Sequence, residues 1–349
     1  MTVSRRDFLI ASATAGASRL DAQPRVGARA IDLHHHFVSP AYVKALAAKE
    51  GHHMAGYTTW FALDRLQVYT PAKDIEDMDR DGVAASILSS TSPGVWFGKP
   101  DETRRLAREM NEFAAKAISD HKGRLGLFAV LPLPTIEDSL REIEYAFDSL
   151  KADGVGLLTS YGYHWLGDST FRPVLDELNR RGAVVYTHPI DASCCQDIQP
   201  EVNPPTIEYN TDTSRTIFSL IVGDAATRYS NIRFIFSHAG GTMPSLVERF
   251  GIGAPDTIAD NLARPAEPNS RLSHLRRFYY DTAQSTNPVQ MQGLKLIVGA
   301  SQIVFGTDYP FGSAAKHLAG LEKCGFTGPE LRGIYRENAG RLLPKFQAG

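Results

Sequence analysis

The stretch that decides the fold reads Ala30-Ile31-Asp32-Leu33-His34-His35-His36, where a short apolar run ends in a D-x-H-x-H pattern. Successive side chains of a β-strand point to opposite faces, so His34 and His36 share one face and can bind one ion. A divalent metal needs imidazoles that already point toward it, and one strand end then supplies half of a site. Three adjacent histidines can also be a surface accident, so the rest of the chain has to decide.

Short apolar or β-branched runs alternate with longer amphipathic segments from residue 29 onward, which is typical of βα units around a parallel sheet. Eight runs are expected to be strands, over residues 30–37, 83–89, 125–131, 154–160, 183–188, 232–238, 278–283 and 303–307. Helices are expected between them, over residues 102–119, 136–151, 171–181, 214–229, 244–250, 288–298 and 314–323. This alternation predicts an α/β fold, a single-domain (β/α)8 TIM barrel, with an open doubly wound sheet as the alternative.

Two segments break the alternation and are expected to be long rim loops. The first follows the first strand over residues 38–76, and the second follows the fifth strand over residues 189–212. Long loops in compact domains are usually lids or interfaces. Residues 329–342 are expected to form a final amphipathic helix, and no domain boundary is expected within residues 28–349.

The N-terminal residues 1–27 are expected to be a twin-arginine export signal followed by a disordered linker. Ser4-Arg5-Arg6-Asp7-Phe8-Leu9-Ile10 precedes a run of small and apolar residues, as in bacterial signals of this kind. A frayed N-terminus without a signal is the alternative. The signal predicts a protein that is periplasmic or otherwise exported by this route.

Composition excludes several classes of protein. The net charge of −2 and the absence of a basic stripe argue against nucleic-acid binding. Outside the N-terminus no apolar stretch approaches the roughly 20 residues of a membrane-spanning helix, so no span is expected in the mature chain. Three cysteines, Cys194, Cys195 and Cys324, do not make a disulfide framework and are expected to be free thiols.

Further histidines and one aspartate fall at the ends of other expected strands. His188 ends the fifth strand, His238 ends the sixth strand, and Asp308 directly follows the eighth strand in Gly306-Thr307-Asp308-Tyr309-Pro310. The carboxyl ends of barrel strands face one rim, where catalytic residues lie. Each of these residues alone could simply cap a strand or bond its own backbone. Their coincidence with His34 and His36 predicts a metal site at the mouth of a barrel.

Four motifs occur in order within residues 29–345: D-L-H-H-H-F, T-H-P, F-S-H-A-G-G and F-G-T-D-Y-P-F. Together they resemble the amidohydrolase superfamily, and within it the branch of metal-dependent, non-oxidative decarboxylases that includes aminocarboxymuconate semialdehyde decarboxylase. Ile87-Leu88-Ser89, Leu131-Pro132-Leu133-Pro134 and residues 154–159 are similar, more narrowly, to the 6-methylsalicylate decarboxylases.

The resemblance implies a ligand set of His34, His36, His188 and Asp308 around one divalent metal, zinc in the first place and manganese as the alternative. His238 would then lie beside the metal and contact substrate or water. Residues 158–160 lack the lysine that bridges two metals in binuclear relatives, which favours a single ion. The branch commonly forms homodimers, and it uses an arginine from a neighbouring subunit in the segment that holds Arg249.

The chemistry of these residue types supports two reactions. A small aromatic carboxylate with an ortho oxygen can chelate a metal, and it loses carbon dioxide after its ring carbon is protonated. Asp308 is the expected proton donor and His238 the expected hydrogen-bond partner of the phenolate oxygen. The alternative is hydrolysis of a lactone, ester or amide by a metal-activated water. A third hypothesis, a catalytically silent binding protein, predicts that metal ligands are lost, whereas all four are present.

Candidate substrate contacts lie in the rim segments. Arg65 and Arg249 are candidates to hold a substrate carboxylate, and a solvated surface position is the alternative for both. Trp60 and Trp96 are candidates for an aromatic wall against a planar substrate, although large aromatic side chains also simply pack. The role of Asp191, three residues after His188, is left open.

Overall fold

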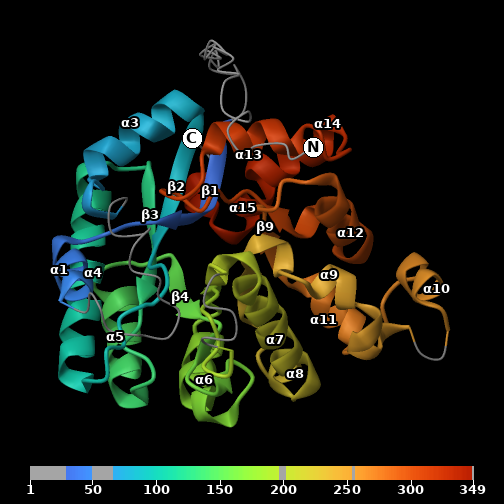
Figure 1. The fold of residues 1–349 in the computed structure, drawn as a ribbon, viewed down its shortest axis with the longest axis horizontal. Helices are drawn as coiled ribbons and strands as arrows, with labels where there is room; N and C mark the ends of the chain where they lie inside the picture. Colours follow the sequence, from blue (N-terminus) through green and yellow to red (C-terminus); the bar gives the residue numbers. More distant parts are fainter. Residues whose placement is uncertain (1–28, 49–65, 196–201, 254–255, 348–349) are drawn as a thin grey trace, which may run out of the picture.

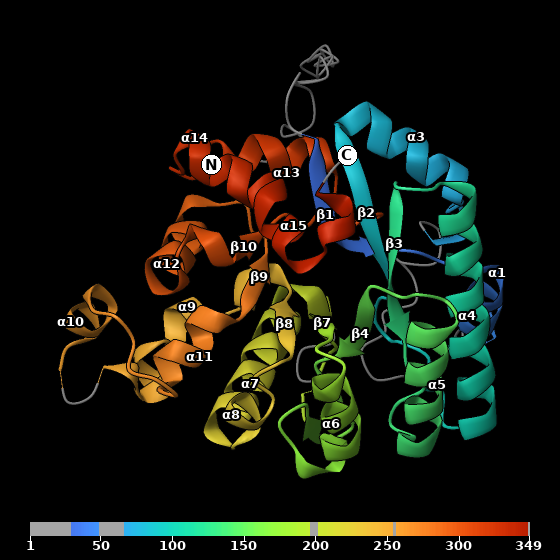
Figure 2. The same cartoon turned by 180° about the vertical axis from the view of Figure 1, so that it is seen from behind.

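A computed structural model of the chain describes residues 29–48, 66–195, 202–253 and 256–347. It confirms the predicted (β/α)8 barrel, with eight parallel strands in the order β1-β2-β3-β4-β7-β8-β9-β10 and helices outside them (Figures 1 and 2). The barrel strands are β1 (Ala30–His36), β2 (Val83–Ser89), β3 (Leu125–Val130), β4 (Gly154–Leu158), β7 (Val184–His188), β8 (Arg233–Phe236), β9 (Tyr279–Asp281) and β10 (Ile303–Val304). Residues 1–27, and with them the expected export signal, lie outside the described residues.

The barrel closes where β1 meets the chain that follows β10. The Leu33 N–H donates to the Phe305 carbonyl at 3.0 Å, and the Asp308 N–H donates to the His34 carbonyl at 2.8 Å. The His36 N–H donates to the Tyr309 carbonyl, also at 2.8 Å. Only two residues of the expected eighth strand have regular strand pairing, because the rest of that segment bonds to β1 in an irregular way.

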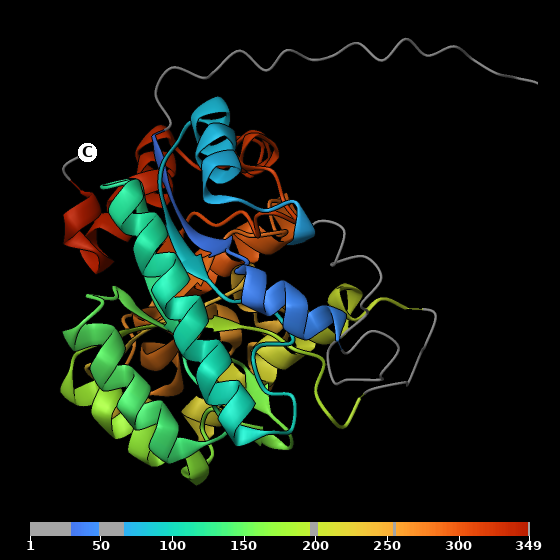
Figure 3. The ribbon, with the colours of Figure 1, turned by 90° about the vertical axis from the view of Figure 1, so that its left-hand side faces the viewer.

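The helices form an outer layer, in which α4 and α5 lie side by side (Figure 3). Their bounds are α1 (Pro40–Ala47), α3 (Pro71–Asp81), α4 (Pro100–Asp120), α5 (Ile136–Asp148), α6 (Arg172–Arg180), α7 (Glu208–Val222), α8 (Ala225–Arg228), α9 (Met243–Leu246), α10 (Ile258–Ala263), α11 (Arg271–Arg277), α12 (Pro288–Val298), α13 (Ala314–Leu321), α14 (Gly328–Arg332) and α15 (Asn338–Leu342). None of the described helices combines the length and the apolar character needed to cross a membrane.

Several helices differ from the expectation. The helix expected over residues 214–229 is two helices, α7 and α8, because extended backbone at Gly223 ends the first of them. The segment expected as a helix over residues 244–250 holds the short α9 and then a π-helical turn, Glu248–Ile252. A two-stranded hairpin of β5 (Ser160–Tyr161) and β6 (His164–Trp165) follows β4 and was not expected.

The first rim connection contains helices where a loop was expected. Its described part contains α1 and α3, and each begins with a hydroxyl side chain that caps the helix and a proline in its first turn. Ser39 Oγ accepts the Tyr42 N–H, and Thr70 Oγ1 accepts the Lys73 N–H, both at 3.1 Å. The Ser-Pro and Thr-Pro pairs are helix-start signals that the sequence reading did not use.

The barrel interior is filled by apolar side chains from six strands. They cluster with the C-terminal segment, which packs against the end of the barrel opposite the mouth through Ala339, Leu342, Leu343 and Phe346. The expected C-terminal helix over residues 329–342 is α14, a π-helical turn over Gly333–Glu337 and α15 in succession. A larger apolar cluster lies between the strands and the outer helices. With one end covered by apolar packing, polar chemistry is confined to the carboxyl ends of the strands.

Candidate metal centre

A shift in strand register at the end of β1 directs two histidines to the barrel mouth. The pairing of β1 with β2 is irregular between Asp32 and His35. Such a bulge redirects the side chains that follow it. His34 and His36 are fully buried, and their Nε2 atoms lie 3.1 Å apart.

The outer nitrogens of three histidines are held by other groups. His34 Nδ1 lies 2.8 Å from an oxygen of Asp281, and His36 Nδ1 lies 3.2 Å from Ser89 Oγ. His188 ends β7, and its Nδ1 lies 2.8 Å from the Pro189 carbonyl oxygen, to which it donates. A proton on Nδ1 leaves the Nε2 lone pair of each ring free to bind a metal.

His238 and Asp308 come from tight turns with unusual backbone geometry. His238 has φ 53° and Asp308 has φ 62°, a left-handed conformation that is uncommon for residues other than glycine. Behind His238, Gly241 also has positive φ, and a Cβ atom there would lie 2.0 Å from the Asn210 carbonyl oxygen. The turn after β8 therefore requires glycine, and it aims the His238 side chain at the mouth.

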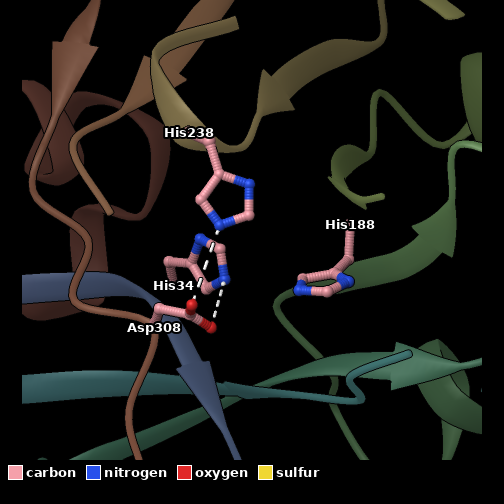
Figure 4. Close-up of side chains that lie close together, drawn as sticks. All are labelled: His34, His188, His238 and Asp308. Carbon is pink, nitrogen blue, oxygen red and sulfur yellow. Dashed lines mark ion pairs between the residues drawn. The ribbon is translucent and has the colours of Figure 1, made fainter. Parts of the chain in front are cut away.

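These side chains converge on one point. His34, His188, His238 and Asp308 are all buried and offer ligand atoms that lie within 4.8 Å of one another (Figure 4). His36 joins them, because its Nε2 atom lies 3.1 Å from Asp308 Oδ1. The structure thus brings together all five residues that the sequence analysis placed at this site.

The spacing of the donor atoms fits a metal ion. His34 Nε2, His36 Nε2 and Asp308 Oδ1 form a triangle with sides of 3.1, 3.1 and 3.2 Å. A zinc ion lies about 2.0 to 2.1 Å from its nitrogen and oxygen ligands, so two ligand atoms on one ion lie roughly 3 to 3.5 Å apart. His238 Nε2 is farther from Asp308, at 3.7 Å from Oδ2. The triangle suits one divalent cation, and the donor atoms of His188 and His238 lie close enough to contribute further ligands.

Electrostatic coupling within the group is strong. Burial lowers the pKa of His34, but Asp281 and Asp308 outweigh it and raise that pKa to about 10. Burial opposes ionisation of Asp308, yet His34, His238 and His36 hold its pKa well below the usual range. Burial and the neighbouring histidines keep the pKa of His188 well below its usual value. Positive charge is therefore favoured between His34 and Asp308, where a divalent cation would supply it.

Asp281 is a site residue that the sequence analysis missed. It ends β9, is fully buried, and contacts His34 through Oδ2 at 2.8 Å. Its other oxygen, Oδ1, accepts the backbone N–H of His238 at 2.9 Å and that of Ala283 at 3.0 Å. An aspartate near the end of the expected strand over residues 278–283 was the available signal, since His188 and His238 also lie at strand ends.

A second buried network supports the D-x-H-x-H turn from behind. Asp32 accepts the His34 backbone N–H at 3.0 Å and the Thr307 backbone N–H at 3.1 Å. His35 lies between Asp32 and Asp74, with ring nitrogens 3.0 and 2.8 Å from their oxygens. His35 therefore ties β1 to α3, while its two neighbours face the metal centre.

A cavity of about 270 Å³ is lined by residues at or after the ends of β2, β4 and β7. The five site residues are not among its lining residues, but Leu158, which lines it, pairs with His188 in the sheet. Trp96, one of the expected aromatic wall residues, also lines it and is 37% exposed. Asp191, whose role the sequence left open, lies on the cavity wall.

The other expected substrate contacts are placed differently. Trp60 and Arg65 lie outside the described residues. Arg249 is exposed on the π-helical turn that follows α9. Within the described part of the chain, Trp96 is therefore the candidate that lines the cavity near the site.

The chain is similar to known proteins over most of its length. The amidohydrolase family model matches residues 31–345. The 6-methylsalicylic acid decarboxylase of Penicillium expansum is 37% identical over 288 residues, covering 80% of this chain and 84% of that protein. Decarboxylase yanB of Aspergillus niger is 34% identical over 338 residues, covering 91% of this chain and 88% of that protein.

A solved structure shares the fold. The dihydroxybenzoic acid decarboxylase from Polaromonas, determined with bound manganese and the inhibitor 2-nitroresorcinol, has a TM-score of 0.73 and 20% sequence identity to this chain. The match covers 90% of this chain and 96% of that one. The likeness extends over the whole barrel.

Proposed function

Since the chain belongs to the amidohydrolase family, we propose that it is a metal-dependent carboxy-lyase that decarboxylates a small, salicylate-like aromatic acid without oxidation. One observation carries this proposal: the donor atoms of His34, His36, His188, His238 and Asp308 converge at the barrel mouth. We assign His34, His36, His188 and Asp308 as the metal ligands and place His238 beside the ion. A cavity with Trp96, Phe97 and Tyr161 in its wall is connected to them through Leu158, the strand partner of His188. Decarboxylase yanB and the 6-methylsalicylic acid decarboxylase, each more than 30% identical to this chain, are decarboxylases by name.

The bound ion would polarise the carboxylate and hydroxyl oxygens of the substrate and fix the orientation of its ring. We propose zinc, because a site rich in imidazole with one carboxylate suits that ion, with manganese as the alternative. The related structure with bound manganese supports manganese as the alternative ion. Elemental analysis of the purified protein distinguishes the two ions.

Asp308 is proposed to carry a proton during turnover. Its pKa lies well below the usual range, so the side chain is a carboxylate before substrate binds. The substrate hydroxyl proton passes to Asp308, which returns it to the ring carbon that bears the carboxylate. The electrons of the carbon–carbon bond stay on the ring, carbon dioxide leaves, and the product oxygen recovers a proton from water. His238 Nε2, 3.7 Å from Asp308, is placed to hydrogen-bond the ring oxygen.

The proposal is tested with the metal-loaded protein and a panel of hydroxybenzoates and lactones. We expect carbon dioxide release from an ortho-hydroxybenzoate and loss of that activity after treatment with a chelator. Acid formation from a lactone, without carbon dioxide release from any hydroxybenzoate, would instead identify a hydrolase.

Two further proposals concern assembly and location. We propose that the protein is a homodimer in which Arg249, exposed within its own chain, reaches the substrate carboxylate of the partner, while Arg65 and Trp60 act within their own chain. Light scattering of the purified protein tests the dimer.

We also propose export by the twin-arginine route, which the pair Arg5-Arg6 supports. Replacing both arginines with lysine should retain the protein in the cytoplasm.

A further inference from the structure

Two adjacent cysteines lie on the loop that follows β7. The Sγ atoms of Cys194 and Cys195 are 2.7 Å apart, so both thiols point to the same side of the chain. Cys194 is exposed and Cys195 is partly buried. The Cys195 N–H donates to the Ala192 carbonyl at 2.8 Å, which folds the loop into a turn and holds the pair in place.

The surroundings of the pair distinguish the two sulfurs. Arg215, on α7, donates from Nη2 to Cys195 Sγ at 3.5 Å. Burial and the neighbouring Cys194 raise the pKa of the Cys195 thiol, and Arg215 partly opposes them. Cys194 is the more accessible sulfur and Cys195 the more protected one. Cys324, in contrast, is buried three residues after the end of α13, and its thiol donates to the Gly320 carbonyl at 3.3 Å.

We propose that Cys194 and Cys195 form a redox-active vicinal dithiol, which small disulfides convert reversibly into a disulfide between the two neighbouring residues. The Cys194 thiolate attacks one sulfur of the small disulfide, forms a mixed disulfide and releases one thiolate. The Cys195 thiolate then attacks the Cys194 sulfur and releases the second thiolate. The protein loses two protons and two electrons, and the small disulfide accepts both electrons and becomes two thiols.

Ring strain makes such a bond labile. Neighbouring Cα atoms across a trans peptide are about 3.8 Å apart. Unstrained disulfides join Cα atoms roughly 4.4 to 6.8 Å apart. Strained disulfides are more oxidising and are easily reduced, which is typical of regulatory bonds and not of structural ones. The pair therefore suits reversible oxidation.

The position of the pair connects this chemistry to the cavity. The same loop places Ile190, Asp191 and Ser193 in the cavity wall, directly after the expected metal ligand His188. Closing the ring requires the peptide between Cys194 and Cys195 to reorient, and that peptide is held by the bond from Cys195 to Ala192. Oxidation should therefore change the shape of the cavity wall. This consequence rests on the proposed function, whereas the redox chemistry does not.

The experiment treats the full-length, metal-loaded protein with oxidised glutathione at about pH 8, where thiolates form more readily. Remaining thiols are blocked with iodoacetamide after denaturation, and the peptides are weighed by mass spectrometry. We expect the peptide that holds Cys194 and Cys195 to lose two hydrogen atoms and to escape blocking, and dithiothreitol to reverse both effects. Full blocking of both cysteines, a glutathione adduct that persists, or a link between two chains would each overturn the proposal.

Three variants sharpen the test. Cys194→Ser and Cys195→Ser should each accumulate a glutathione adduct, because the second attack is lost. Cys324→Ser is the matched control and should form the disulfide as the wild type does.

In the oxidised wild type, the KM for a hydroxybenzoate should rise several-fold and recover on reduction. An unchanged KM in fully oxidised protein would overturn the link to the cavity, and an absence of activity in the reduced protein would count against the proposed function alone.

Discussion

Asp281 contacts His34 from behind the metal centre, with its Oδ2 atom 2.8 Å from the Nδ1 atom of the imidazole. The same carboxylate accepts the backbone N–H of His238 through its other oxygen at 2.9 Å. One buried side chain thus fixes the orientation of an expected metal ligand and the turn that carries an expected substrate contact. Carboxylates in this position also raise the basicity of the histidine that they hold.

Changing Asp281 to Asn should weaken metal binding. The amide keeps the shape of the side chain, but it loses the charge, and its single oxygen cannot accept from both His34 Nδ1 and the backbone N–H groups of His238 and Ala283. Loss of such an outer partner typically costs about 10- to 100-fold in metal affinity. Competition with a chelator measures this change, and Asp120→Asn, at an exposed position on α4, is the matched control. Equal affinities in the two variants would show that Asp281 does not support the site.

Changing Asp308 to Asn should stop turnover while leaving much of the ligand geometry in place. An amide cannot carry the proton to the ring carbon, and general acid–base catalysis is worth about 10²- to 10⁴-fold in rate. The kcat for a hydroxybenzoate should fall by that range, measured on protein whose metal content is determined at the same time. A rate near that of the wild type, at equal metal content, would rule out the proton-carrying role.

Acid should destabilise the outer surface of α6 through Glu177. Hydrogen bonds from Arg180 and Arg181 lower the pKa of Glu177 to about 2, from 4.5 without these partners. Because the folded state favours the charged form, the stabilisation is fully present above pH 4.5 and is lost as the pH falls toward 2. The difference in free energy of unfolding between the wild type and Glu177→Gln should therefore shrink over this range.

Denaturant unfolding of both proteins at several pH values measures this difference. Glu144→Gln, an exposed position on α5, is the control and should show a smaller dependence. A difference that stays constant between pH 5 and pH 3 would contradict the assignment of this shift to the two arginines.

Much of the barrel could be predicted, because buried parallel strands are short apolar runs that periodicity reveals. The expected bounds of β2 agree with the structure, as do those of α12, where Asn287 caps the helix and Pro288 follows. The last strand was overestimated, because its outer half closes the barrel through single hydrogen bonds to β1 and not through a regular ladder. Such closure depends on three-dimensional contacts that a local pattern does not encode.

The site residues that lie at strand ends could be predicted from their residue type and position. The residues that hydrogen-bond to them from distant segments of the chain could not. His34 and Asp281 are 247 residues apart in sequence, and only the closed barrel brings them together. His35 was visible in the histidine run, but its partner Asp74 lies on α3, within a segment that was expected to be a loop. The place of Asp281 near a strand end could have marked it as a candidate, but its contact with His34 appears only with the fold.

The position of the metal ion tests the account most directly. Anomalous diffraction from crystals of the metal-loaded protein would locate it, with elemental analysis of His188→Ala as the companion measurement. We expect a single peak within bonding distance of His34 Nε2, His36 Nε2, the His188 imidazole and an oxygen of Asp308, and loss of the metal in the variant. A peak bound by His238 in place of His36, a peak elsewhere in the molecule, or full occupancy in His188→Ala would contradict the account.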